Sequence, residues 1–208
     1  MSTLNTDRQW GWPAKLFHWV VGLGIIAMLI GGFMMTTGIY WLMPEAEAFQ
    51  VRFEWTQWHK SFGFVIFFLA LARLVWRWFQ PTNPELPPDT NGLERLAANA
   101  SHGLMYALML ALPLTGWAMA STSPLNDDDA YPEKVPNMVF GAFEMPDAMQ
   151  PGDREVSNVF ALLHEWAGWA LAALLVVHVG AALKHHLIDR DTVLRRMLPG
   201  RLRGEAAE

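Results

Sequence analysis

Four histidines lie within or at the edges of long apolar segments of the chain: His18, His59, His164 and His178. An ionisable side chain inside a lipid-spanning segment is costly, and its presence is by default a functional hypothesis. A neutral imidazole is the usual axial ligand of haem iron, and it also binds zinc and other transition metals. Interhelical hydrogen bonding is the alternative role for any one of these histidines, since polar side chains join helices in membrane bundles.

The composition narrows the chemistry that these histidines can do. The chain has no cysteine, which excludes disulfides, thiolate metal sites, iron–sulfur clusters and covalently attached c-type haem. The apolar segments carry no cluster of acidic ligands of the kind that holds a di-iron site. Haem of the b type, with two histidine ligands for each iron, therefore fits better than zinc or di-iron.

The spacing of the histidines predicts two such sites at different depths. Fourteen residues separate His164 from His178, which in a helix corresponds to roughly 21 Å of rise and nearly four turns, so both imidazoles face one side. His18 lies at the same end of the predicted bundle as His178, and His59 at the same end as His164. We expect the first pair to hold the iron of an inner haem and the second pair that of an outer haem.

Small residues follow each of these histidines by four positions. A flat macrocycle must lie close to the helix backbone beside its ligand, which requires a small side chain one turn away on the same face. His102 also lies at the inner depth, but Tyr106 follows it by four, so we interpret His102 as a structural hydrogen bonder rather than an axial ligand. The small residues at the four positions are Gly22, Gly63, Gly168 and Ala182.

Two further residues could act beside the inner haem. Arg73 lies fourteen residues after His59, on the same face, where a guanidinium can pair with haem propionates. The alternative is that Arg73 extends to the membrane surface, as we expect of Arg77. His185 lies two turns beyond His178 and could relay protons to a quinone, whereas basic residues just inside a membrane usually only anchor it.

Four apolar segments must position these residues. The chain of 208 residues is 52% hydrophobic and only 17% charged, and its apolar runs of about twenty residues match the ~30 Å hydrocarbon layer of a bilayer. Pro113 interrupts the third run, which a membrane helix tolerates when its neighbours satisfy the backbone. The sequence thus predicts an all-α, integral membrane four-helix bundle forming a single domain, 1–208, with spans at about 15–36, 58–79, 99–120 and 160–183.

The distribution of charge predicts the orientation. Lysine and arginine gather in the N-terminal segment, the connection after the second span and the C-terminal tail, whereas residues 121–159 hold eight acidic residues against Lys134 and Arg154. Because short basic loops stay on the cytoplasmic side, we expect both termini to be cytoplasmic and the long acidic loop to be a periplasmic surface cap. The net charge of −5 gives no reason to expect nucleic acid as a partner.

Four stretches of the sequence carry a resemblance to a known family: AKLFHW, WHKSFGFVIFFLALARLVWRW, ASHGLMYALMLALPLTGW and LHEWAGWALAALLVVHVGAALKHHLIDRDTVLRRM. They resemble the four spans of the prokaryotic cytochrome b561 family, and only residues 121–159 fall outside the match. The resemblance implies an inner-membrane cytochrome with two b haems that exchanges electrons with the quinone pool. It places the family's axial ligands on the same four histidines, and the region associated with quinone on residues 184–186.

The function that we expect is that of a di-haem carrier, passing electrons between a periplasmic redox partner and ubiquinone in the lipid. One group within the family resembles superoxide oxidases, which pass an electron from superoxide to ubiquinone. The acidic loop repels such an anion, although Lys60 and Arg52 could form a local positive entrance. The same pattern is also compatible with a cytochrome b anchor subunit of a periplasmic oxidoreductase and, more weakly, with a membrane scaffold that has no redox activity.

Overall fold

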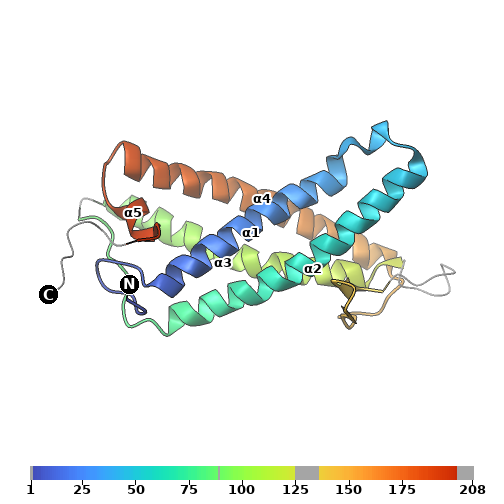
Figure 1. Cartoon of the computed structure of the whole chain (residues 1–208), viewed down its shortest axis with the longest axis horizontal. Helices are drawn as coiled ribbons and strands as arrows, with labels where there is room; N and C mark the ends of the chain where they lie inside the picture. Colours follow the sequence, from blue (N-terminus) through green and yellow to red (C-terminus); the bar gives the residue numbers. More distant parts are fainter. Residues whose placement is uncertain (1, 89, 125–135, 201–208) are drawn as a thin grey trace.

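The computed structural model describes residues 2–88, 90–124 and 136–200. Two short helices and two short strands connect or follow the long helices: η1 (Ile39–Leu42), α5 (Val193–Met197), β1 (Met138–Val139) and β2 (Phe143–Glu144). The long helices lie side by side in one elongated bundle (Figure 1), and they are α1 (Trp12–Thr37), α2 (Glu45–Trp78), α3 (Gly92–Ser121) and α4 (Arg154–Leu187).

All four long helices are long and apolar enough to cross a membrane. The prediction of an all-α membrane bundle of four helices is therefore confirmed. The helices extend beyond the predicted spans, because their polar ends also favour helix. Glu45 and Glu47 stabilise the first turn of α2, well before the apolar run begins. The start of α3 is fixed by a capping box between Asn91 and Glu94.

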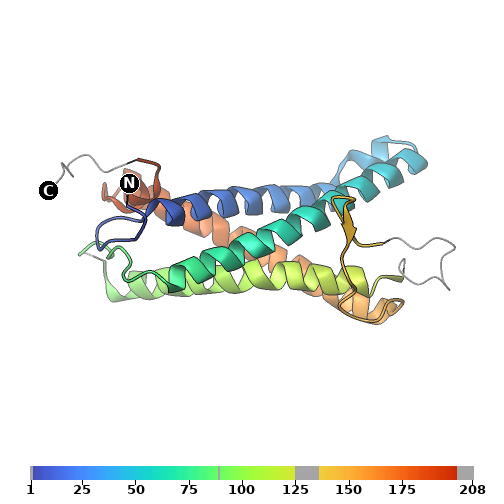
Figure 2. The same cartoon turned by 60° about the horizontal axis from the view of Figure 1, so that its bottom comes forward.

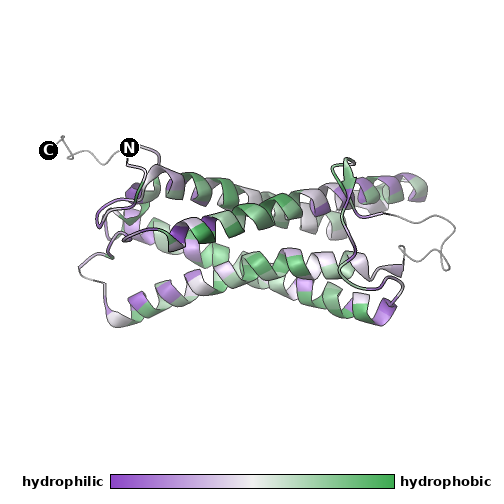
Figure 3. Cartoon of the chain, turned by 90° about the horizontal axis from the view of Figure 1, so that it is seen from below, coloured by the Kyte–Doolittle hydropathy of each residue, from purple (hydrophilic) through white to green (hydrophobic). Residues whose placement is uncertain are grey.

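The surface of the bundle is apolar around its middle. Figure 3 shows hydrophobic residues concentrated along the central part of the helices and hydrophilic residues toward their ends. Val176 on α4 is 74% exposed, which would be unfavourable in water but is expected of a side chain that faces lipid. The buried core is small by comparison and lies mid-bundle, at Val21, Ile25, Ala70, Met109 and Leu171.

The start of α1 and the end of α4 lie at the same end of the bundle (Figures 1 and 2). The Trp19 indole Nε1 donates a hydrogen bond of 2.9 Å to the Met197 carbonyl oxygen, and the Lys15 ammonium donates one of 3.1 Å to that of Leu198. The segment that follows α4 therefore packs against the beginning of α1. Which side of the membrane this end occupies remains a prediction from the basic residues.

The loop between α3 and α4 contains a small β-hairpin that the sequence did not predict. Strands β1 and β2 are antiparallel, with Met138 opposite Glu144 and Val139 opposite Phe143. Three residues, 140–142, connect the strands, and two of them have positive φ, Phe140 at 51° and Gly141 at 66°, as tight hairpin turns favour. Asp127, Asp128, Asp129, Glu133 and Lys134 of the predicted acidic cap lie outside the described residues.

Candidate cofactor sites

The structure brings the four predicted histidines together in two pairs. His18 of α1 faces His178 of α4 with ring centroids 6.1 Å apart, and His59 of α2 faces His164 of α4 with centroids 6.2 Å apart. An imidazole nitrogen binds a transition metal at about 2.0 Å, so two imidazoles on opposite sides of one metal have centroids about 6 Å apart. Both pairs therefore fit a shared iron, and ligation itself remains a prediction.

The hydrogen bond of His164 prepares its ring for a metal. Its Nδ1 lies 2.9 Å from the backbone carbonyl oxygen of Leu112 on α3. Because a carbonyl oxygen only accepts, this contact assigns the ring proton to Nδ1 and leaves the lone pair of Nε2 free. Histidines that bind metals commonly donate their other ring N–H to a carbonyl in this way.

Two residues of α3 that lie beside His164, Thr115 and Gly116, were not predicted from the sequence. The Thr115 hydroxyl lies 3.2 Å from His164 Nδ1, and a Cβ added at Gly116 would lie 3.1 Å from its Cε1. The His164 ring therefore packs directly on the backbone of α3, where a larger residue would displace it. The sequence did hold one indication of this contact, the glycine that follows Pro113 by three residues, since a glycine within a helix commonly marks the close approach of another element.

The predicted glycines leave space beside the paired histidines. A Cβ added at Gly22 or Gly168 would meet nothing within 4 Å, and at Gly63 it would meet only the Met28 side chain, at 3.4 Å. A flat macrocycle beside a histidine ligand needs such space. Two further glycines on α1 were not predicted, Gly31 and Gly32, and added Cβ atoms there would lie 3.8 Å and 3.5 Å from the His59 ring.

A third histidine joins the inner pair. The ring centroid of His102, on α3, lies 5.4 Å from that of His178, so His18 and His102 both flank the α4 histidine. Geometry alone leaves each of them within reach of a metal held by His178. Our interpretation of His102 as a structural residue thus remains a prediction.

Arg73 also belongs to the inner site. Its Nη2 lies 3.2 Å from Nδ1 of His18, and its guanidinium lies over the Tyr106 ring, 5.3 Å from the centroid. The side chain is thus directed into the bundle rather than along the lipid face. A guanidinium only donates, so this contact needs an unprotonated Nδ1, whereas a His18 that binds iron through Nε2 carries its proton on Nδ1. Ligation would therefore free Arg73 for another acceptor, such as a haem propionate.

His185 lies at the end of α4 in a polar cluster. Its Nδ1 lies 2.6 Å from Oδ2 of Asp191 and 3.3 Å from Oδ2 of Asp189. Asp189 also binds the Lys184 ammonium at 2.8 Å. The sequence pointed to His185, but not to its carboxylate partners in the turn after α4. An imidazole hydrogen-bonded to a carboxylate can hold and deliver a proton.

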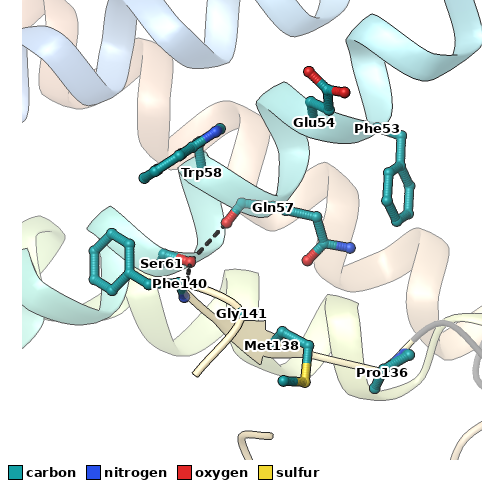
Figure 4. A pocket seen from close by; sticks show the side chains of 9 residues that line it. All are labelled: Phe53, Glu54, Gln57, Trp58, Ser61, Pro136, Met138, Phe140 and Gly141. Atoms are coloured by element: carbon teal, nitrogen blue, oxygen red, sulfur yellow. Dashed lines mark hydrogen bonds between the residues drawn. The ribbon is translucent and has the colours of Figure 1, made fainter. Parts of the chain in front are cut away.

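A groove of about 390 Å³ lies at the opposite end of the bundle, between α2 and the hairpin (Figure 4). Gln57 and Ser61 line it, and each is two residues from His59, so they face away from His59 on the helix. The groove is therefore separate from the paired histidines. Its aromatic and apolar lining residues are Phe53, Trp58, Met138 and Phe140.

A four-helix membrane bundle with two facing histidine pairs is the arrangement expected of a helical membrane cytochrome of the b type. The chain belongs to the prokaryotic cytochrome b561 family, whose model matches residues 9–200. It is 30% identical over 203 residues to Cytochrome b561 homolog 2 of Escherichia coli (strain K12), covering 95% of each chain. It is 27% identical to the Probable superoxide oxidase CybB of Yersinia pestis, covering 88% of this chain and 91% of the relative.

A further relative is the Probable Ni/Fe-hydrogenase B-type cytochrome subunit of Bradyrhizobium diazoefficiens, which is 22% identical and covers 90% of this chain and 82% of its own. Family membership and the four apolar helices make this chain a multi-pass protein of the bacterial inner membrane. Its activity is membrane electron transfer, and haem b is the cofactor that the family implies. The hypothesis of a scaffold without redox activity is therefore wrong.

Proposed function

We propose that this chain holds two b haems and carries electrons across the membrane between the quinone pool and a redox partner on the periplasmic side. The observation that supports this most is that α4 contributes one histidine to each of two facing pairs, at 6.1 Å and 6.2 Å. His18 and His178 hold the inner iron, and His59 and His164 the outer one. Haem iron supplies reversible one-electron transfer.

The residues around the pairs have separate tasks in this proposal. Gly22, Gly63 and Gly168 keep side chains away from the macrocycles, as the open space beside them supports. Leu112 orients His164 through its carbonyl oxygen. Arg73 pairs with propionates of the inner haem.

Ubiquinone reduction consumes protons, and the proposal gives this task to His185. Its hydrogen bond to Asp191 holds the imidazole in one orientation at the end of α4. Because His185 lies two turns beyond His178, it lies near the inner site and at the membrane surface. It can therefore take protons from water and pass them to a reduced quinone.

The proposal is tested in liposomes that contain the full-length protein, ubiquinol in the lipid and ferricyanide trapped inside. We expect ferricyanide absorbance to fall at a rate proportional to protein content, and the haem absorption bands to show reduction once the ferricyanide is consumed. His178→Ala should abolish the protein-dependent rate, because the inner iron loses a ligand. Protein-dependent transfer that persists in this variant would contradict the proposal.

A second candidate function is oxidation of superoxide, which the name of the Yersinia pestis relative supports. The ammonium of Lys60, in the predicted positive entrance, donates a 3.1 Å hydrogen bond to Oδ1 of Asn137. Asn137 in turn donates to Oδ1 of Asp147 at 3.0 Å. The acidic residues of this loop would also slow an approaching anion.

Rapid mixing of the purified protein with superoxide distinguishes the two functions. If the chain is a carrier for a protein partner, superoxide reduces its haems slowly, and the triple variant Asp127→Asn, Asp128→Asn, Asp129→Asn reacts faster, with a difference that fades at high salt. Near diffusion-limited haem reduction that is insensitive to these substitutions would instead identify a superoxide oxidase. An anchor subunit would be reduced only when its periplasmic partner is present.

A further inference from the structure

The β-hairpin lies beside the membrane-spanning part of α2 rather than beyond the helix ends (Figures 1 and 2). The backbone N–H of Phe140 donates a 2.9 Å hydrogen bond to Oγ of Ser61 (Figure 4). The ring of Phe143 lies 6.3 Å from that of Phe64, between centroids. Both α2 residues belong to the apolar run that predicts the second span.

The neighbouring helix α1 gives the depth of this contact. A Cβ added at Gly63 would lie 3.4 Å from the end of Met28, so Phe64 lies at about the level of Met28. Met28 precedes the end of α1, Thr37, by nine residues, which corresponds to roughly 13 Å of helix. The Phe143 ring therefore lies well inside the thickness that α1 spans, not in the water beyond it.

The outward surface of the hairpin is aromatic and uncharged. Phe140 is 45% exposed and Phe143 is 52% exposed, and residues 138–143 contain no charged side chain. Phe140 packs on Trp58 and Phe62 of α2, with centroids 5.9 Å and 5.3 Å away. The exposed rings thus continue the lipid-facing surface of α2, and burial of aromatic side chains in lipid is favourable where their exposure to water is not.

Several backbone N–H groups of the hairpin have the hydrogen-bond partners that a segment at this depth needs. Lipid offers no partners, so non-helical backbone is tolerated in the membrane only where protein satisfies it. The Ala142 N–H donates to the Val139 carbonyl oxygen at 2.9 Å, and the Met145 N–H donates to that of Asn137 at 2.8 Å. With the Phe140 bond to Ser61, the tip of the hairpin is tied both to itself and to α2.

We propose that residues 138–144 form a re-entrant hairpin that inserts into the membrane leaflet opposite the termini, with Phe140 and Phe143 among the lipid acyl chains. Glu144, at the open end of the hairpin, is exposed and is the one charged residue within this segment. The loop is thereby fixed to the bilayer as well as to α2, close to His59. The partner of this surface is lipid.

The absence of native cysteine allows a direct test by single-cysteine spin labelling of the full-length protein in phospholipid vesicles. A label at Phe143→Cys is compared with one at Phe68→Cys, on the lipid face of α2, and one at Gln150→Cys, in the exposed part of the same loop. Collisions with oxygen report lipid, and collisions with a water-soluble nickel chelate report water. We expect the oxygen-to-nickel accessibility ratio at Phe143 to exceed that at Gln150 several-fold and to approach that at Phe68.

Two results would overturn the proposal. A ratio at Phe143 equal to that at Gln150 would place the hairpin in water, and low accessibility to both reagents would show that a second protein chain covers it. Phe140→Cys repeats the comparison at a second position, so the outcome does not depend on one variant folding. Since the readout is accessibility, it does not depend on the proposed haem ligation or quinone reaction.

Discussion

Nδ1 of His164 on α4 donates a 2.9 Å hydrogen bond to the backbone carbonyl oxygen of Leu112 on α3. The bond fixes the tautomer with the ring proton on Nδ1, which leaves the lone pair of Nε2 free for a metal. It also explains why α3, which contributes no proposed iron ligand, packs closely along α4 around the outer site. The position of the outer site thus depends on α3 as well as on α2 and α4, which carry its two histidines.

Gly116→Ala should disturb the outer site selectively. The new Cβ would lie 3.1 Å from Cε1 and 3.3 Å from Nδ1 of His164, so the ring must shift, at a cost of about 1–3 kcal/mol. Haem content of the purified variant should fall toward one per chain. Gly103→Ala on the same helix is the control, because a Cβ there meets nothing within 4 Å. Equal haem content in both variants would show that His164 does not need this packing.

Removal of an inner ligand should cost one haem and leave the other. We expect His178→Ala and His18→Ala each to lower the ratio of haem to protein by about half, since the outer pair uses other residues. His102→Ala should keep both haems, because His102 is interpreted as a structural hydrogen bonder. Loss of one haem from the His102 variant, with full content in the His18 variant, would transfer the inner ligand to α3.

Gly168→Leu tests whether the space beside His164 belongs to a macrocycle. A Cβ at this position meets no protein atom within 4 Å, so the leucine side chain starts in open space beside the helix. A bound macrocycle would nevertheless be displaced, so the outer haem should be lost or become high-spin in the absorption spectrum. Gly180→Leu is the matched control, since position 180 is equally open but lies roughly 160° around α4 from His164. Unchanged spectra in both variants would mean that the glycine spacing has no connection with haem.

Asp191→Asn should slow the reaction with quinone without changing haem content. The carboxylate lies 2.6 Å from His185 Nδ1 and holds the imidazole in one orientation, so loss of the carboxylate should lower the quinone reduction rate about tenfold or more. Asp189→Asn is the control, because that carboxylate is farther from His185 and also binds Lys184. A rate in the Asp191 variant equal to that of the unmodified protein would remove His185 from the proton path.

The sequence was sufficient to predict the bundle and to predict that His18 lies near His178 and His59 near His164. Long apolar runs specify span-length helices, and the interval between His164 and His178 determines that one helix serves two depths. The pairing then follows from which end of a span each histidine occupies. The helix lengths and the depths of the histidines depend on local sequence spacing, so they could be predicted before the structure was known.

The surroundings of the histidines could not be predicted in the same way. Leu112 contacts His164 through its backbone carbonyl, which every residue type has. Gly116 matters because α3 lies close to α4 there. Neither contact can be recognised from a pattern of side-chain types. The hairpin at residues 138–144 escaped because its strands contain only two residues each, too short for an alternating pattern. Each of these features depends on contacts between segments that are far apart in the sequence.

The ratio of b haem to protein in the unmodified, purified chain tests the central claim most directly, when it is measured together with the reduced and oxidised absorption spectra. Two facing histidine pairs predict two haems per chain, with the sharp reduced bands of low-spin, bis-histidine iron. One haem per chain, or a high-spin spectrum from either site, would contradict the account.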